Sequence, residues 1–401
     1  MKIALYMTTI LEYGGGMEKY LIETAANLAN KPGVTVDVIT MDDKVTRRIT
    51  SGLSIFWMKK LDPALNYKED LDDIRRRLGK ARYFKEPTIR SLRQRLQQYD
   101  VIYSKNELIE GFVLRCLLHY KKLPPVIFGG HTPIFFPIAT AFHSKLHNFL
   151  YASFLYRFLA GGVQAFHALN DADAARYKKL FSRHEVRRIY NPFDVASFRA
   201  AADRWPYVLK ARTAGPQPIR ILWLGRLSEQ KGVDRLAAII PEVNMRMGDA
   251  GVPISWSIFG DGELRGQVEA LAADQPNVAY YGHADQKQVS SIYAQHQVCL
   301  STSKWEGYPY NLVECQAFGL QAFAFDIPGP RDILHAYDGG HIAQDPADMV
   351  RQLSESLIAY GNPGQVPRSQ PSEQFRPDVI YAQLHSFFSH IHSLSPQPSY
   401  A

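Results

Sequence analysis

Residues 219–240 read IRILWLGRLSEQKGVDRLAAII and carry the pattern that decides the fold. The apolar run 219–224 predicts a buried strand, the polar stretch after Gly225 predicts a loop, and a helix is predicted from about Gly232 to Ile240. The same order of strand and helix follows three more times, with strands at 254–259, 278–281 and 298–301 and helices at 263–273, 286–295 and 311–318. Strands that alternate with helices predict a parallel sheet with helices on both faces.

The first half of the chain repeats this pattern less regularly. Strands are predicted at 3–9, 34–40, 101–103, 126–128 and 163–169, and helices at 17–29 and from about Asp171. The stretch TAGPQP at 213–218 is rich in turn residues and precedes the second series. The fold class is therefore α/β, with two Rossmann-like domains.

Composition excludes several classes of protein. The chain has 401 residues, of which 46% are hydrophobic and 21% charged, so it can bury a large core and is not disordered. Its cysteines, Cys116, Cys299 and Cys315, are odd in number and far apart, which excludes a disulfide framework and a zinc ribbon and predicts a reducing, cytoplasmic location. No apolar stretch is long enough for a membrane-spanning helix.

Positive charge is concentrated in the first half. Residues 1–190 contain 30 Lys and Arg against 18 Asp and Glu, and the remainder contains 16 against 21. The densest basic stretch is 75–95, in which a helix is predicted from Thr88 onward. This stretch is either the solvated face of a surface helix or a patch that contacts an anionic membrane. We expect no nucleic-acid partner, because no basic motif interleaved with aromatic residues occurs.

Two glycine-containing loops suggest phosphate binding. Gly14-Gly15-Gly16 lies between a predicted strand and a predicted helix, where glycines let the backbone approach a phosphate beside the helix N-terminus. It matches neither the dinucleotide fingerprint nor a P-loop, and a structural tight turn is the alternative. In the second half, Arg226 and Lys231 follow a strand, where two fixed cations can neutralise a diphosphate.

The stretch EGYPYNLVE at 306–314 is the most informative one for function. It follows a predicted strand and opens a helix near Pro309, so that Glu306 lies before the helix and Glu314 within it. Each carboxylate can accept hydrogen bonds from two sugar hydroxyls, and the N–H groups between them can hold a phosphate. A helix cap beside a surface glutamate is the alternative.

These stretches together resemble the retaining glycosyltransferase family 4. The spacing from Glu306 to Glu314 resembles that family's paired-glutamate EX7E motif, and GRLSEQKG, GDGELR (260–265) and GGGME resemble its other landmarks. His131, in GGHTP, resembles its active-site histidine. The resemblance is strong over 219–335 and looser over 1–195.

The resemblance implies the GT-B fold, in which two facing Rossmann-like domains hold a nucleotide sugar in the cleft between them. The domains would be 1–192 on the acceptor side and 193–376 on the donor side, and the C-terminal helix of 377–401 would pack back on the first. His131, Glu306, Arg226 and Lys231 would be catalytic. The donor would be bound by Gly15, Gly16, Gly225, Gly260, Gly262, His283, Gly307, Tyr308, Pro309, Tyr310, Asn311, Leu312 and Glu314.

We therefore expect a retaining glycosyltransferase that needs neither a metal nor another cofactor. It would move a hexosyl-type sugar from a UDP- or GDP-linked donor to a saccharide or lipid-linked acceptor, in cell-surface polysaccharide or glycolipid biosynthesis. The location would be cytoplasmic, with a peripheral position on the inner membrane face through the basic N-terminal domain. The rival functions are a sugar-nucleotide epimerase and an inactive basic adaptor that binds membrane or polyanion. A phosphorylase is disfavoured, since no lysine motif for pyridoxal phosphate occurs.

Three further features have competing interpretations. The strings Asp70-Leu-Asp72 and Asp171-Ala-Asp173 are expected to cap helices rather than to bind metal. His167 is expected to be a satisfied core residue. The aromatic residues of 134–160 form either a core helix or an apolar wall that meets a lipid.

Overall fold

The computed structural model describes residues 1–13, 16–52, 69–139, 142–209 and 217–394. The chain forms two compact units. The first comprises Met1–Phe135, Thr140–Asn191 and Asp378–Ala401, and the second comprises Phe136–Ala139 and Pro192–Pro377. Each unit has its own hydrophobic core beside its own sheet. Among the described residues, no helix is long and apolar enough to cross a membrane.

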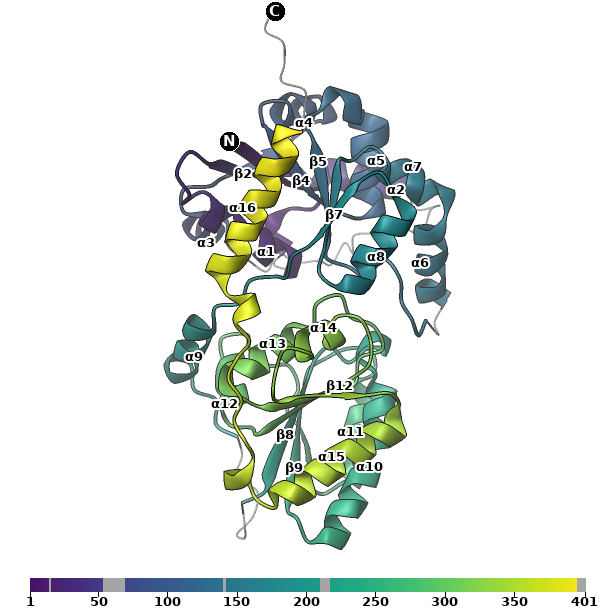
Figure 1. Cartoon of the computed structure of the whole chain (residues 1–401), viewed down its shortest axis with the longest axis vertical. Coiled ribbons are helices and arrows are strands. Elements are labelled where there is room, and N and C mark those ends of the chain that lie inside the picture. The colour runs from purple at the N-terminus through teal and green to yellow at the C-terminus, as the bar shows by residue number, and fades with distance from the viewer. Residues whose placement is uncertain (14–15, 53–68, 140–141, 210–216, 395–401) are drawn as a thin grey trace, which may run out of the picture. The chain divides into compact units, whose positions relative to one another are not determined.

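The first unit contains a seven-stranded parallel sheet in the order β3-β2-β1-β4-β5-β6-β7 (Figure 1). Its strands are β1 (Lys2–Met7), β2 (Thr35–Met41), β3 (Arg82–Glu86), β4 (Val101–Lys105), β5 (Val126–Gly130), β6 (Ala165–Ala168) and β7 (Glu185–Arg188). Its helices are α1 (Gly16–Leu28), α2 (Asp43–Gly52), α3 (Leu71–Leu78), α4 (Ile89–Leu96), α5 (Leu108–Phe112), the π-helix η3 (Val113–Leu118), α6 (Phe142–Ala152), α7 (Phe154–Ala160) and α8 (Asp171–Leu180).

The second unit contains a six-stranded parallel sheet in the order β10-β9-β8-β11-β12-β13. Its strands are β8 (Ile219–Leu224), β9 (Ile254–Phe259), β10 (Val278–Tyr280), β11 (Val298–Ser301), β12 (Gln321–Phe325) and β13 (Gly340–Ala343). Its helices are α9 (Val195–Arg204), α10 (Val233–Ala250), α11 (Arg265–Asp274), α12 (Val289–Ala294), α13 (Tyr310–Glu314), α14 (Pro330–Leu334) and α15 (Pro346–Tyr360). The expected α/β class with two parallel sheets is confirmed.

Strand order places a ligand-binding edge in each sheet. The order reverses between β1 and β4 in the first sheet and between β8 and β11 in the second. Ligands of open parallel sheets bind beyond the carboxyl ends of the strands at such a reversal. The loops after β8 and β11 therefore flank the expected site of the second unit, and the loops after β1 and β4 flank that of the first.

The last helix, α16 (Pro377–Ser393), packs on the first unit. The ring of Phe388 lies 5.6 Å from that of Tyr103 on β4, and His390 lies 2.8 Å from Glu185 on β7. The helix thus contacts both the central strand β4 and the edge strand β7 of the first sheet. It does so although the chain passes through the second unit between β7 and this helix.

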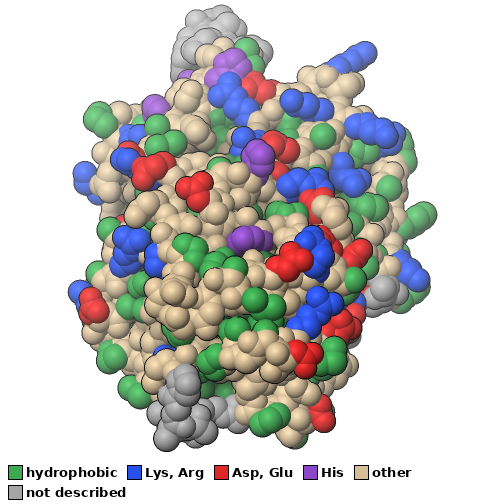
Figure 2. Space-filling model, turned by 60° about the horizontal axis from the view of Figure 1, so that its bottom comes forward, with side chains coloured by type: hydrophobic (Ala, Val, Ile, Leu, Met, Phe, Trp, Pro, Cys, Tyr) green, Lys and Arg blue, Asp and Glu red, His purple; other side chains and the backbone are tan. Residues whose placement is uncertain are grey.

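The basic stretch 75–95 is largely paired with carboxylates. Arg82 makes two hydrogen bonds to buried Asp37, at 2.9 and 2.7 Å, and Arg95 donates to buried Glu86 at 2.8 Å. Thr88 caps α4 in a reciprocal capping box, as the predicted helix start requires. On the face drawn in Figure 2, Lys and Arg side chains likewise stand close to Asp and Glu in several places. Much of this charge therefore stabilises the fold.

The aromatic segment forms two helices, not one core helix. Tyr151 and Tyr156 are buried, but Phe149 is 69% and Phe154 81% exposed. Phe136 belongs to the second unit, where its ring stacks on Trp305 at 4.8 Å. The core interpretation is thus right for the tyrosines and wrong for these exposed phenylalanines.

Candidate functional site

The loop after β8 and the loop after β11 are held together by backbone contacts. Gly232 has φ of 65°, and a Cβ there would lie 2.0 Å from the carbonyl oxygen of Thr302, so that only glycine fits. The hydroxyl of Thr302 donates to the carbonyl of Lys231 at 2.8 Å, and the N–H of Lys304 donates to the carbonyl of Gln230 at 2.8 Å. The close approach of the two loops sets the positions of the side chains that they carry.

A lysine and a glutamate meet where these loops touch. Lys231 Nζ lies 2.5 Å from Oε1 of Glu306, which also accepts a hydrogen bond from Ser303 at 2.9 Å. The glutamate side chain is buried and the lysine side chain is 21% exposed. The ammonium group has three donors, so it can bind a further anion while it keeps this pair. The sequence placed both residues at one sheet edge but did not predict their ion pair.

Glu314 is the last residue of α13, the helix that follows β11 and its loop. Its Oε2 accepts a hydrogen bond from the hydroxyl of Tyr293 on α12 at 3.0 Å. Burial and the neighbouring carboxylate raise the pKa of Tyr293, so the phenol remains a donor. Asn311 donates to the carbonyl of Leu224 at 3.5 Å, and its buried Oδ1 has no hydrogen-bond partner among the described residues. Tyr293 was missed by sequence reasoning, since its helix carries no motif.

The glycines after β9 form the third loop at this edge. The N–H of Gly225 donates to the carbonyl of Phe259 at 3.1 Å. Gly260 has φ of 147°, and a Cβ there would lie 1.8 Å from the carbonyl oxygen of Gly225. A Cβ on Gly262 would lie 2.4 Å from the carbonyl oxygen of Leu227. These glycines therefore have a packing role, whatever they bind.

The other predicted donor residues lie beside these loops. Arg226 is exposed, with no side-chain hydrogen bond or ion pair to any part of the chain that the structure describes. His283 is exposed beyond β10, next to Tyr281, whose ring stacks on Phe259 at 4.7 Å. Gly307, Tyr308, Pro309 and Leu312 are buried around the start of α13, and Tyr310 is exposed. The geometry therefore leaves Arg226 open to an anion.

In the first unit, His131 follows β5 and belongs to a chain of hydrogen bonds. Its Nε2 lies 2.8 Å from the hydroxyl of Tyr103, and this hydroxyl lies 2.7 Å from Nδ1 of His167. The Nε2 of His167 lies 2.7 Å from the carbonyl oxygen of Ile189. His167 is fully buried, and burial lowers its pKa to about 4, so that it is neutral at pH 7.

These contacts determine the tautomer of His131. A carbonyl only accepts, so His167 carries its proton on Nε2, and its Nδ1 must accept from Tyr103. Because the hydroxyl proton of Tyr103 is engaged in that hydrogen bond to His167, His131 must donate from Nε2 to the tyrosine oxygen. Burial, His167 and Lys105 lower the pKa of His131 well below its usual range. His131 is therefore a neutral imidazole whose Nδ1 presents a lone pair.

A second polar group lies next to His131. Lys105, at the end of β4, is 3.2 Å from Glu107, whose carboxylate also accepts from Thr132 at 3.1 Å. Glu107 and Glu110 raise the pKa of Lys105 against the effect of burial. Lys105 and Glu107 were missed by sequence reasoning. They lie at the end of β4, beside the reversal of strand order, and this position could have identified them as candidate site residues.

The glycine turn after β1 is described only in part. Gly15 lies outside the described residues. Gly16 begins α1, and a Cβ there would meet no atom of the other described residues within 4 Å. The phosphate-binding role of this turn stays a prediction.

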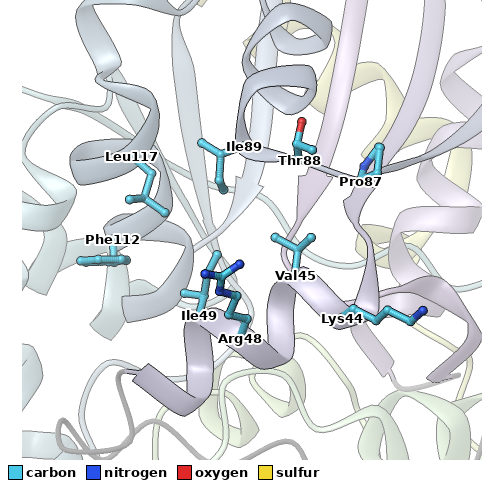
Figure 3. A pocket seen from close by; sticks show the side chains of 9 residues that line it. All are labelled: Lys44, Val45, Arg48, Ile49, Pro87, Thr88, Ile89, Phe112 and Leu117. Atoms are coloured by element: carbon cyan, nitrogen blue, oxygen red, sulfur yellow. The ribbon is translucent and has the colours of Figure 1, made fainter.

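The first unit also contains an apolar pocket of about 640 Å³ (Figure 3). Its walls come from α2, from the start of α4 and from α5 with η3, and Lys44 and Arg48 are its charged lining residues. No predicted site residue lines it. The lining lacks the carboxylates that bind sugar hydroxyls, so it suits an apolar ligand better than a nucleotide.

The two DxD strings lie at helix starts. Asp70 caps α3 by accepting from the N–H groups of Asp72 and Asp73, as expected. The cap of α8 is Asn170, not Asp171; Asp171 instead pairs with Arg188 at 2.7 Å. Among the residues that the structure describes, no three His, Cys, Asp or Glu side chains are placed to hold a metal ion.

Two family models match the chain. The model described as Glycosyltransferase Family 4 matches residues 14–197, and that described as Glycosyl transferases group 1 matches residues 218–358. An uncharacterised 41.2 kDa protein from the cps region of Klebsiella pneumoniae is 22% identical, over 73% of this chain and 80% of its own. The phosphatidyl-myo-inositol mannosyltransferase of Mycobacterium tuberculosis is 31% identical over 46% of this chain. The match spans 47% of the mannosyltransferase.

The fold has a close counterpart among solved structures. The Anabaena protein HepE, in complex with UDP and glucose, matches with a TM-score of 0.63 over 97% of this chain and 100% of its own, at 15% identity. Such a low identity shows the fold alone. Together with the two family models, it confirms the resemblance drawn from the motifs: this chain belongs to the GT-B superfamily of glycosyltransferases.

Proposed function

We propose that this glycosyltransferase is retaining and independent of metal and other cofactors. It moves a hexosyl group from a UDP- or GDP-linked sugar to a saccharide or lipid-linked acceptor, in cell-surface polysaccharide or glycolipid biosynthesis. It acts in the cytoplasm, at the inner face of the membrane. The cps-region relative and the mannosyltransferase support the role in polysaccharide or glycolipid biosynthesis, and the UDP and glucose bound to HepE support a nucleotide-sugar donor.

The observation that carries the proposal is the pairing of Lys231 with Glu306 beside exposed Arg226. A nucleotide sugar needs cations for its diphosphate and a carboxylate for its sugar hydroxyls, a few ångströms apart. Here the pair at 2.5 Å supplies both from neighbouring loops at the strand-order reversal. An ordinary surface ion pair would not require Gly232 to let the loops touch.

The proposed chemistry assigns a role to each of these side chains. Negative charge develops on the diphosphate as the bond to the sugar C1 breaks, and Arg226 and Lys231 stabilise it. Glu306 accepts from sugar hydroxyls and Glu314 from the ribose hydroxyls. The acceptor oxygen bonds to C1 on the face that the diphosphate leaves, and its proton passes to the departing phosphate oxygen. This order retains the anomeric configuration. His131, as a neutral acceptor at Nδ1, orients a substrate hydroxyl.

Thermal unfolding with added nucleotides tests the donor site. UDP, GDP, ADP and CMP are added separately, with EDTA present, to the native chain and to Arg226→Ala. A ligand at 100 times its Kd stabilises by about 2.7 kcal/mol, which raises the melting temperature measurably. We expect UDP or GDP to stabilise the native chain and to lose most of this effect in the variant.

Arg246→Ala is the matched control, because Arg246 is an exposed arginine on α10 of the same unit. It should respond as the native chain does. If no nucleotide raises the melting temperature, the donor assignment fails, and the basic adaptor without transferase activity becomes the better account.

A further inference from the structure

Helices α6 and α7 present an unusual group of exposed aromatic side chains. Among the described residues, every exposed phenylalanine lies on these two helices: Phe142, Phe149, Phe154 and Phe158, with exposed Leu155 beside them. Positions 142 and 149 lie seven residues apart on α6, and 154 and 158 four apart on α7, so each pair shares one helix face. The helices pack against each other (Figure 1). Exposed aromatic residues in such a group indicate an interaction surface.

The sequence segment that forms this surface carries charge of one sign. Residues 111–170 contain no Asp or Glu, although they contain five Lys and Arg. Lys145 on α6 and Arg157 on α7 are exposed, and the guanidinium of Arg115 lies 4.6 Å from the ring centre of Phe158. The positive charges therefore lie among the apolar side chains, and residues 111–170 supply no carboxylate that could pair with them.

We propose that this surface, formed by Phe149, Phe154, Leu155 and Phe158 with Lys145 and Arg157, docks the protein on an anionic membrane. Phenylalanine and leucine rest at the boundary of headgroups and acyl chains, and Lys and Arg bind anionic headgroups. A second copy of this chain fits less well, because a symmetric contact would bring the same positive charges together. The inference deepens the proposed function, on which it rests, by naming the surface that holds the enzyme at its lipid-linked substrate.

This membrane-docking surface lies outside the stretch 75–95, the basic stretch that composition offered as a membrane contact. The basic stretch 75–95 is denser in charge, but Arg82 and Arg95 are used by Asp37 and Glu86. On α6 and α7, by contrast, Lys145 and Arg157 are exposed beside apolar side chains and pair with no carboxylate of the described residues. Net charge alone therefore points to the right unit but not to the right face.

Sedimentation with vesicles tests the docking surface. The full chain is mixed with vesicles of phosphatidylcholine alone, or of phosphatidylcholine with phosphatidylglycerol, and the bound fraction is measured. We expect binding to the mixed vesicles, weakened by salt. The double variant Phe149→Ser/Phe154→Ser should bind about tenfold more weakly, and Lys145→Gln about fivefold, which corresponds to about 1 kcal/mol per cation.

The control Met245→Ser/Ile358→Ser removes exposed apolar side chains from the second unit and should bind like the native chain. All variants should keep the native melting temperature and the native response to nucleotides. A phenylalanine variant that binds mixed vesicles like the native chain would overturn the proposal. So would a native dimer in sedimentation velocity that this variant converts to monomer. Loss of the nucleotide response in every protein would instead refute the donor site, so the two failures are distinguishable.

Discussion

Replacing Tyr103 by phenylalanine should disturb His131 without touching it directly. The tyrosine hydroxyl accepts from Nε2 of His131 and donates to Nδ1 of His167, at 2.8 and 2.7 Å. Tyr103→Phe keeps the ring and removes both hydrogen bonds. Nothing then holds the proton of His131 on Nε2, and the imidazole can exchange tautomers and rotate. Tyr103 is a positioning residue in this argument, because it acts through His131.

The structure sets the size of the effect on stability. His167 is fully buried and keeps its bond to the carbonyl of Ile189, so its Nδ1 becomes a buried acceptor without a partner. Such a group costs about 1–3 kcal/mol. His131 is only half-buried, and water can satisfy its N–H. We therefore expect the free energy of unfolding of the first unit to fall by about 1–3 kcal/mol.

Nitrogen NMR of ¹⁵N-histidine-labelled protein measures the tautomer directly. In the native chain the signals of His131 should show a protonated Nε2 and an unprotonated Nδ1, and in Tyr103→Phe they should show a mixture. Sugar transfer, measured with the donor that the melting experiments identify, should fall in kcat by about tenfold, or about 1.4 kcal/mol.

Tyr99→Phe is the matched control. Its hydroxyl donates to buried Asp37 at 2.6 Å in the same unit, so its loss should also lower stability. It should change neither the His131 signals nor kcat. If Tyr103→Phe were destabilised like Tyr99→Phe, with native signals and native kcat, the hydrogen-bond chain would be structural only, and the reasoning would be refuted.

Two further predictions concern the second unit. Glu306→Gln removes the charge that faces Lys231 at 2.5 Å. UDP or GDP should still raise the melting temperature of this variant, but the matching nucleotide sugar should no longer raise it further than the nucleotide does. If the nucleotide sugar still gave its full additional shift, contact between Glu306 and the sugar would be excluded. Gly260→Ala places a Cβ 1.8 Å from the carbonyl oxygen of Gly225 and should lower the free energy of unfolding, measured in urea, by more than about 2 kcal/mol. The control Gly248→Ala lies in a helix, where its Cβ would meet none of the other described residues, and should raise that free energy by up to about 1 kcal/mol. Equal effects of the two variants would contradict the close approach of Gly260 to Gly225.

The sequence predicted the strands that consist mostly of large apolar residues. The predicted strands 219–224, 254–259 and 298–301 coincide with β8, β9 and β11. β3 and β7 were missed because they are edge strands with the charged sequences RYFKE and EVRR, in which the alternating pattern of a half-buried strand is weak. β12 was missed although it is fully buried, because QAFAF carries small residues and no β-branched ones.

The sequence predicted which residues of the candidate site follow strands, but not which of their side chains contact one another. Lys231 and Glu306 follow strands, so they had to lie at one sheet edge; their ion pair depends on the contact of Gly232 with Thr302, for which the sequence has no signal. His167 was rightly expected to be a satisfied core residue, but nothing in the sequence linked it to His131 through Tyr103. A hydrogen-bond chain over three strands is a property of strand order.

The glycines of the motifs have two roles that the sequence cannot separate. Gly232 and Gly260 lie in stretches that resemble landmarks of the family, and each also lies where a Cβ would collide with the backbone of a neighbouring loop. An inactive relative would need the same glycines to keep the same loops together. Glycine motifs therefore establish the fold of the site more firmly than its activity. The evidence for activity lies in side chains that packing does not require, above all exposed Arg226 and the carboxylate that Lys231 holds at the strand-order reversal.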